Sequence, residues 1–291
     1  MNTILRSGAA VAEISSLGAE LVSFRRTDTD TEYIWSGDAA YWTGRSPVLF
    51  PMIGAAAGEA VRVNGEAYPL ARHGFARRSE FTLVETSESQ AVFRLSHSAD
   101  TLASYPYPFH LYLTYTLSGS TLDIGYRVEN PGDGEMYFQL GTHPAFNCPI
   151  GGEGSFTDYY LEFEQTEHLE RLFLNESGLI TPGQSEAMLG GDNKMPLNHE
   201  MFAHDALVFR NVQSKSVALK SRQSDRSVTV AFTGFPDLGI WQPKNAPFLC
   251  IEPWHGVADS EGFTGGIQEK QGVISLPAEG HFTSSLMITF N

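Results

Sequence analysis

The sequence predicts an all-β protein, a large antiparallel β-sandwich with few short helices, folded as a single domain over residues 1–291. Three observations predict this class. Apolar and polar residues alternate with period two through many short segments, turn residues separate those segments, and continuous helical periodicity of useful length is missing. Because no βαβ rhythm appears, we expect antiparallel sheets packed face to face.

The predicted strands follow one another closely along the chain. The clearest alternation is found in residues 91–98, 109–117, 121–130, 136–141, 159–165, 206–212, 216–221, 227–234 and 284–290. Turn sequences separate them, among them LSGST, NPGDGE, PIGGEGS and FTGFPDLG, which supply Gly, Pro, Asn and Asp. Short helical turns are expected only near 37–42, 101–104 and 258–270. No linker or internal repeat divides the chain, and PIGGEGS is short enough to be a loop.

Charge and composition narrow the classes of partner. The chain has 34 acidic and 19 basic residues, for a formal net charge of −15. Nucleic acids and anionic membranes attract basic surfaces, so neither is expected as a partner. No window approaches the roughly 20 consecutive apolar residues of a membrane helix. The first residues lack the apolar core of a signal peptide, and the only two cysteines, Cys148 and Cys250, predict no disulfide scaffold. A cytoplasmic location is expected.

Two stretches that interrupt the strand pattern carry basic residues. In YWTGRSPVLFPMIG, residues 41–54, Arg45 precedes an apolar run bounded by prolines, which suggests extended backbone beside a cavity. The alternative for Arg45 is a surface side chain. In RHGFARR, residues 72–78, His73 and Arg77 belong to a basic cluster in an acidic chain. Such a cluster can bind a carboxylate, a phosphate or sugar hydroxyls, or can form ion pairs with the protein's own acids.

A histidine and a glutamate occupy the other two stretches. His143 stands in GTHPAFNCP, between a Gly-Thr pair and a proline, with the aromatic Phe146 nearby. A structural role for a lone histidine after a strand is the alternative to a proton donor. Glu252 ends the apolar FLCIE in residues 248–252 and is followed by a proline. A carboxylate at the end of a buried strand costs free energy unless it is hydrogen-bonded, and burial raises its pKa toward the range useful for proton transfer.

Further residues suggest a site for a sugar. Trp241 and Trp254 flank Glu252, and flat aromatic rings pack against the C–H faces of sugars. Asp205 opens the predicted strand 206–212 and can accept hydrogen bonds from hydroxyls, with a turn role as the alternative. The nine histidines show no H-x-x-x-H spacing, and the cysteines are not paired as in metal sites. No metal and no cofactor are therefore expected.

Five segments occur in an order typical of one known family. RSPVLFPMIG, HGFAR, GTHPAFNCP, HDALVF and FLCIEPWHG resemble segments of the aldose 1-epimerase (galactose mutarotase-like) family, and the chain looks most like its shorter bacterial branch. The resemblance covers essentially the whole chain. It implies a galactose mutarotase-like supersandwich with a polar cleft across one sheet.

The resemblance also implies roles for particular residues. His143 and Glu252 fall on the family's catalytic pair, Arg45 and His73 on substrate-binding positions, and Asp205 on an acidic substrate ligand. Mutarotation needs a base for the C1 hydroxyl proton and an acid for the ring oxygen, which fits Glu252 as general base and His143 as general acid. Each positioned acid or base contributes about 10²–10⁴-fold.

Three functions remain open from the sequence. The first is an aldose 1-epimerase acting on a hexose. The second is a hexose-6-phosphate 1-epimerase, suggested by the basic cluster and by Arg77 in particular. The third is a non-catalytic carbohydrate-binding protein that uses the aromatic residues Phe146, Trp241 and Trp254. In each case the partner is a small-molecule sugar, and a monomer or homodimer is expected.

Overall fold

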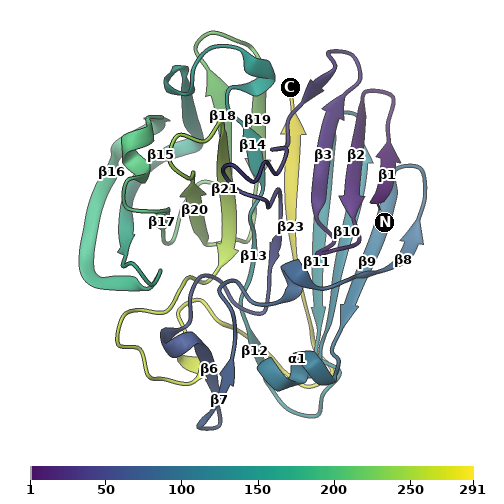
Figure 1. The fold of residues 1–291 in the computed structure, drawn as a ribbon, viewed down its shortest axis with the longest axis vertical. Helices are drawn as coiled ribbons and strands as arrows, with labels where there is room; N and C mark the ends of the chain where they lie inside the picture. The colour runs from purple at the N-terminus through teal and green to yellow at the C-terminus, as the bar shows by residue number, and fades with distance from the viewer. Residues whose placement is uncertain (1) are drawn as a thin grey trace.

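Antiparallel pairing organises the chain, as the period-two alternation predicts. The computed structural model describes residues 2–291, and in this part every pair of strands is antiparallel (Figure 1). One sheet is 15-stranded and runs in the order β5-β13-β21-β20-β17-β15-β18-β19-β23-β11-β10-β9-β8, with β14 beside β21 and β16 beside β15. A four-stranded sheet, β1-β2-β3-β4, forms the second layer of the sandwich.

The strands of the large sheet account for most of the chain. They are β5 (Val48–Leu49), β8 (Thr82–Thr86), β9 (Gln90–Ser96), β10 (His110–Ser118), β11 (Thr121–Glu129), β13 (Leu140–Thr142), β14 (Ala145–Asn147), β15 (Tyr159–Leu174), β16 (Ile180–Pro196), β17 (Leu207–Phe209), β18 (Ser216–Ser221), β19 (Ser227–Ala231), β20 (Asp237–Trp241), β21 (Phe248–His255) and β23 (His281–Phe290). Each of the nine segments predicted from alternation contains residues of at least one β-strand in the structure. This confirms the β-sandwich class.

The N-terminal sheet lies over one half of the large sheet and closes the core. It consists of β1 (Asn2–Arg6), β2 (Ala10–Ser15), β3 (Leu21–Arg26) and β4 (Thr31–Glu32), drawn in purple in front of β9–β11 in Figure 1. Phe24 of this sheet stacks on Phe290 of β23 with ring centroids 3.7 Å apart. Tyr115 of β10 donates a hydrogen bond of 2.6 Å to the Ala19 carbonyl. The apolar face of each sheet is therefore buried against the other.

Two small two-stranded sheets and a few helical turns complete the chain. The pairs are β6 (Ala60–Val63) with β7 (Glu66–Pro69) and β12 (Met136–Phe138) with β22 (Ile274–Leu276). The helical elements are α1 (Ala99–Ser104) and the 3-10 turns η1 (Ala57–Glu59), η2 (Ala76–Arg78), η3 (Ile150–Gly152), η4 (Phe156–Asp158), η5 (His199–Phe202) and η6 (Ile267–Glu269). Within the described residues, no helix is long and apolar enough to cross a membrane.

The predicted short helical turns occur in all three places, but only one of them is an α-helix. Residues 101–104 lie in α1, which Ser98 caps by accepting a hydrogen bond from the Thr101 N–H. Residues 37–42 form only a turn, in which two backbone N–H groups donate to the Asp38 carbonyl. In 258–270 only η6 is helical, because glycines such as Gly262, with φ of 79°, interrupt the segment.

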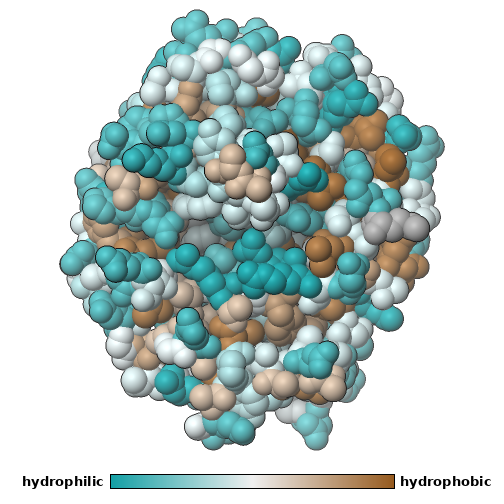
Figure 2. Space-filling view, in the orientation of Figure 1, coloured by the Kyte–Doolittle hydropathy of each residue, from teal (hydrophilic) through white to brown (hydrophobic). Residues whose placement is uncertain are grey.

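The face shown in Figure 2 is mainly hydrophilic. Teal residues cover most of it, and the brown hydrophobic residues form small scattered groups. The buried hydrophobic residues instead form one large cluster between the sheets and two smaller ones. This division is what strict alternation along the strands produces, since one side of each strand faces the core and the other faces solvent.

Candidate active site

His143 lies at a break between two short strands that both pair with β21. In β13, Gly141 pairs with Trp254, and in β14, Ala145 pairs with Cys250. Continuing this register across the break places His143 opposite Glu252. Directly opposed residues on neighbouring antiparallel strands hold their Cβ atoms about 4.5–5.5 Å apart. The interruption by His143 and Pro144 therefore presents the histidine to the glutamate without moving either strand out of register.

Strand β21 is longer than predicted, because it continues past Glu252 and Pro253 to His255. Pro253 pairs with Leu238 of β20. Along the opposite edge of β21, Pro253 falls between the residues that pair with β14 and the residues that pair with β13. A proline lacks an N–H, so it is tolerated where a ladder hydrogen bond is not required. Glu252 consequently lies inside a strand in the middle of the sheet, 1% exposed, rather than at a strand end.

The two side chains meet at the floor of a cavity. Nε2 of His143 lies 3.2 Å from Oε2 of Glu252. The geometry does not make this contact a hydrogen bond, and Oε2 of Glu252 and Nδ1 of His143 both lack a partner. Trp42 stacks on the imidazole with centroids 4.7 Å apart, and Trp241 meets it edge-on at 5.6 Å. The ring is thus held in place by aromatic contacts while its nitrogens remain available.

The cavity has a volume of about 290 Å³, close to the lower end of the range of roughly 300–1,000 Å³ typical of ligand sites. His143, Glu252, His73, Arg77, Asp205 and Trp241 all line it, and so do Trp42, Arg72 and Trp254. Among the residues that the structure describes, four buried side-chain polar atoms have no hydrogen-bond partner. Three belong to this cavity: Nδ1 of His143, Oε2 of Glu252 and Nε1 of Trp254. Buried polar atoms are ordinarily paired, so the site is suited to a polar ligand.

His73 is held as a neutral donor. Its Nδ1 accepts a hydrogen bond of 3.1 Å from the Gly54 N–H, so in the neutral ring the proton lies on Nε2. Burial, with the charges of Arg77, Arg72 and Arg78, lowers the pKa of His73 to about 3. Its ring meets that of His143 edge-on with centroids 5.9 Å apart. His73 can therefore donate a hydrogen bond to an oxygen near the catalytic pair but cannot act as an acid near neutral pH.

Two arginines and an aspartate line the remainder of the cavity. Arg72 lies 3.6 Å from Asp205, and both side chains are partly exposed. Arg77 makes no hydrogen bond or ion pair with any other residue in the range 2–291 that the structure describes. Arg78 is exposed and does not line the cavity. The basic cluster predicted from RHGFARR is therefore divided, with only some of its charges directed into the site.

Burial shifts the pKa values of the central pair toward each other. Desolvation raises the pKa of the Glu252 carboxyl well above its usual range, and the charge of Asp205 adds to this. Desolvation lowers the pKa of His143 well below its ordinary value, reinforced by His73 and Arg77. Because the two groups are in contact they titrate as one unit. The raised pKa of Glu252 and the lowered pKa of His143 favour the form of the pair that holds one proton.

Two sequence-predicted site residues do not line the cavity. Arg45 directs its side chain away, and its Nε donates to the Ser36 carbonyl at 2.8 Å. Phe146 is fully buried in the core, where its ring meets Phe290. The reason is strand parity: Ala145 faces the same side as His143, so Phe146 faces the opposite side. Arg45 and Phe146 are therefore not among the residues that line this cavity, and contact of either with a ligand stays a prediction.

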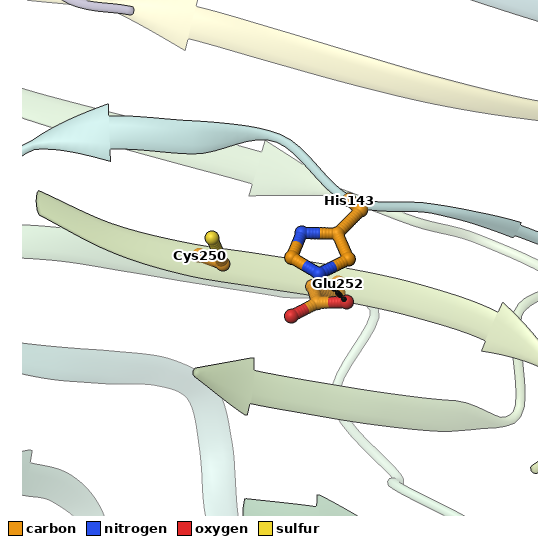
Figure 3. A group of neighbouring side chains, drawn as sticks. All are labelled: His143, Cys250 and Glu252. Atoms are coloured by element: carbon orange, nitrogen blue, oxygen red, sulfur yellow. Dashed lines mark ion pairs between the residues drawn. The ribbon is translucent and has the colours of Figure 1, made fainter. Parts of the chain in front are cut away.

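Sequence reasoning missed two residues of the site, whereas Arg72 belonged to the basic cluster predicted in residues 72–78. Trp42 was visible only as a neighbour of Arg45 in an unusual stretch. Cys250 was noted only as a buried cysteine, yet its Sγ, a nitrogen of His143 and an oxygen of Glu252 lie within 4.8 Å of one another (Figure 3). Cys250 and Glu252 are two residues apart on β21 and so share a face. The signal for this cluster was the i, i+2 spacing in CIE, which a search for H-x-x-x-H does not detect.

Comparison with known proteins identifies the family. The family model for aldose 1-epimerase matches residues 2–264. The chain belongs to the aldose 1-epimerase family. Within it, the chain is 34% identical over 269 residues to the protein LacX of Lactococcus lactis, in both its plasmid and chromosomal forms, covering 89% of each chain.

Solved structures agree with this assignment. A galactose mutarotase-like protein from Lactobacillus casei has a TM-score of 0.94 and 31% identity, covering all of both chains. A galactose mutarotase related enzyme from Lactobacillus acidophilus has a TM-score of 0.95 and 28% identity, covering 100% of this chain and 97% of its own. The resemblance inferred from the sequence motifs is confirmed, and the protein is an isomerase of the aldose 1-epimerase type with the galactose mutarotase-like fold.

Proposed function

We propose that this aldose 1-epimerase family member is a mutarotase that interconverts the α and β anomers of a hexose, with Glu252 and His143 as its proton-transfer pair. One observation carries the proposal. The carboxylate and the imidazole lie opposite each other, 3.2 Å apart, at the floor of a cavity in which both retain unpartnered polar atoms. A pure binding site has no need for an acid and a base in contact.

The proposed reaction uses the single proton of the pair. Burial of the empty site favours the arrangement with that proton on Glu252. Sugar hydroxyls that donate hydrogen bonds to the carboxylate favour the ionic arrangement, with the proton on His143. Glu252 then takes the proton from the C1 hydroxyl while His143 gives its proton to the ring oxygen. The C1–O5 bond breaks and the aldehyde forms.

Ring closure restores the pair. After rotation about C1–C2, His143 takes the proton back from the C5 hydroxyl as O5 attacks the other face of C1, and Glu252 returns its proton to O1. No proton is gained or lost over the cycle. His73 donates to a sugar oxygen, Asp205 accepts from sugar hydroxyls, and Trp241 and Trp254 pack against the C–H faces of the ring.

The proposal predicts the pH dependence of kcat/KM. The pair of His143 and Glu252 is active when it holds one proton. Activity therefore falls at low pH, where the pair binds a second proton, and at high pH, where the pair loses its single proton. Because the pKa of His143 is lowered from 6.5, the acid limb should lie well below pH 6.5. The basic limb should lie above pH 4.5, because the pKa of the Glu252 carboxyl is raised from that ordinary value. An acid limb at the ordinary histidine value, measured by polarimetry across pH, would contradict the shifted pair.

The direct test is polarimetry of freshly dissolved α-D-glucose and α-D-galactose with and without the protein. Acceleration of the change in rotation toward equilibrium is expected for at least one of the two sugars. Binding of the sugar without any acceleration would instead favour the non-catalytic carbohydrate-binding alternative.

A second candidate is a hexose-6-phosphate 1-epimerase. The observation that favours it is Arg77, a guanidinium that lines the cavity with no partner among the described residues. Arginine binds phosphate through paired, charge-assisted hydrogen bonds. If the substrate is phosphorylated, Arg77→Ala should raise KM for glucose 6-phosphate by at least about tenfold, the loss of about 1.5–3 kcal/mol for a charged hydrogen bond. Its KM for glucose should change little.

The matched control is Arg78→Ala, which removes the neighbouring exposed arginine outside the cavity. This variant should behave as wild type on both sugars. Equal losses on glucose and glucose 6-phosphate in Arg77→Ala would count against a phosphate role.

A further inference from the structure

Three different metal-ligand types converge beside the cavity, which His143 and Glu252 line. An imidazole nitrogen of His143, Sγ of Cys250 and a carboxylate oxygen of Glu252 lie within 4.8 Å of one another, and all three residues are buried. Figure 3 shows Cys250 and Glu252 on the same face of β21 with the ring of His143 beside them. Oε2 of Glu252, which lies 3.2 Å from Nε2 of His143, has no hydrogen-bond partner. This oxygen is therefore free to take up a ligand.

We propose that this cluster is a zinc site, in which Zn²⁺ bound by His143, Cys250 and Glu252 inhibits the enzyme by occupying its proton-transfer pair. The binding site stands on the donor geometry alone, whereas the inhibition rests on the proposed function. Histidine nitrogen, cysteine sulfur and carboxylate oxygen are the ligands that Zn²⁺ takes in proteins. Three protein ligands leave a fourth position for water or another ligand. Two of the three residues, His143 and Glu252, line the cavity.

The donor separations suit a small tetrahedral ion. Zinc bonds of about 2.0–2.3 Å place the donors of a tetrahedral site roughly 3.3–3.8 Å apart. The 3.2 Å between Nε2 of His143 and Oε2 of Glu252 is already close to this range. The separations that involve Cys250 are at most 4.8 Å, so Sγ must approach by about an ångström or less.

Charge balance supports the same ion. The Cys250 thiolate and the Glu252 carboxylate together carry two negative charges, which neutralise Zn²⁺, and His143 binds as the neutral ring. The thiol proton, and the proton of the pair, are released to solvent when the metal binds. Arg77 and Arg72 line the same cavity and oppose a cation, while Asp205 beside Arg72 offsets part of their charge. Because the bound site is neutral, these arginines do not prevent binding.

Binding is measured first on the wild-type protein, independently of activity. We expect one Zn²⁺ per chain by calorimetry. With Co²⁺ in its place, we expect the intense near-ultraviolet absorption of a thiolate–cobalt bond. Zn²⁺ should abolish mutarotation at the same stoichiometry, and a chelator should restore it. A protein that binds Co²⁺ without the thiolate band, or that binds neither metal, would overturn the proposal whatever its activity.

Two cysteine variants make the test specific. Cys250→Ala should lose the thiolate band and bind Zn²⁺ at least about a hundredfold more weakly, since even loss of an outer-shell partner typically costs 10–100-fold. Cys148→Ala removes the other buried cysteine, which is not part of the cluster, and should bind both metals as wild type does. Equal zinc affinity in the two variants would show that Cys250 is not a ligand. If zinc binds as expected but no mutarotation is found in the metal-free protein, the proposed function fails and the site stands.

Discussion

Glu252→Gln will reduce kcat/KM for mutarotation by about 10²–10⁴-fold, the contribution expected of one positioned base. Glutamine has nearly the same shape as glutamate but cannot take a proton from the C1 hydroxyl. It also removes the carboxylate that contacts Nε2 of His143. Polarimetry of the purified variant gives the rate directly.

Folding and binding must be intact for that result to be informative. The melting temperature of Glu252→Gln should be close to that of the wild type, because burial already favours the neutral, protonated form of Glu252 and the amide is neutral and of nearly the same shape. Sugar binding, measured by quenching of tryptophan fluorescence from the cavity, should persist. A folded variant with the wild-type rate would remove Glu252 from the mechanism.

Lys270→Met will destabilise the protein by about 3–5 kcal/mol, the usual cost of leaving one member of a buried ion pair alone. Lys270 is 5% exposed and forms an ion pair with Asp259, which is 6% exposed. Asp259 also accepts a hydrogen bond from the Ala57 N–H, so its carboxylate remains buried in the variant. Asp259 directly follows Ala258, which lines the cavity. Urea unfolding measures the loss.

Two further variants separate the ion pair from the loss of a lysine in general. Lys244→Met removes an exposed lysine and should change the free energy of unfolding by no more than about 0.5 kcal/mol. Adding Asp259→Asn to Lys270→Met should recover part of the stability, because the amide carries no charge and its oxygen still accepts from Ala57. A loss of similar size in Lys244→Met would contradict the assigned role of the buried pair.

Most of the fold was predictable because alternation is a local property of the chain. Segments such as 109–117 and 121–130 pair throughout as β10 and β11. Strand β16 was not predicted, because its sequence contains glycines and does not alternate. It forms by pairing with β15 through several register shifts. Such irregular pairing depends on the partner strand and cannot be read from the segment itself.

The site could be predicted only where the chemistry of a residue was unusual for its surroundings. Glu252 in an apolar strand and His143 beside a proline were such cases, and the structure brings them together. Arg45 was equally unusual, but its side chain turns to the Ser36 carbonyl. Phe146 lies in the core, because neighbouring residues of a strand point to opposite faces of the sheet. Orientation and register come from tertiary pairing, which a single sequence does not display.

The central claim, that His143 and Glu252 act as one proton-transfer unit, is tested most directly by polarimetry of His143→Ala, Glu252→Gln and the double variant side by side. Residues that act as a unit show strongly non-additive losses. The account predicts that the double variant is about as slow as the slower single variant. Losses that multiply in the double variant, or a wild-type rate in either single variant, would contradict it.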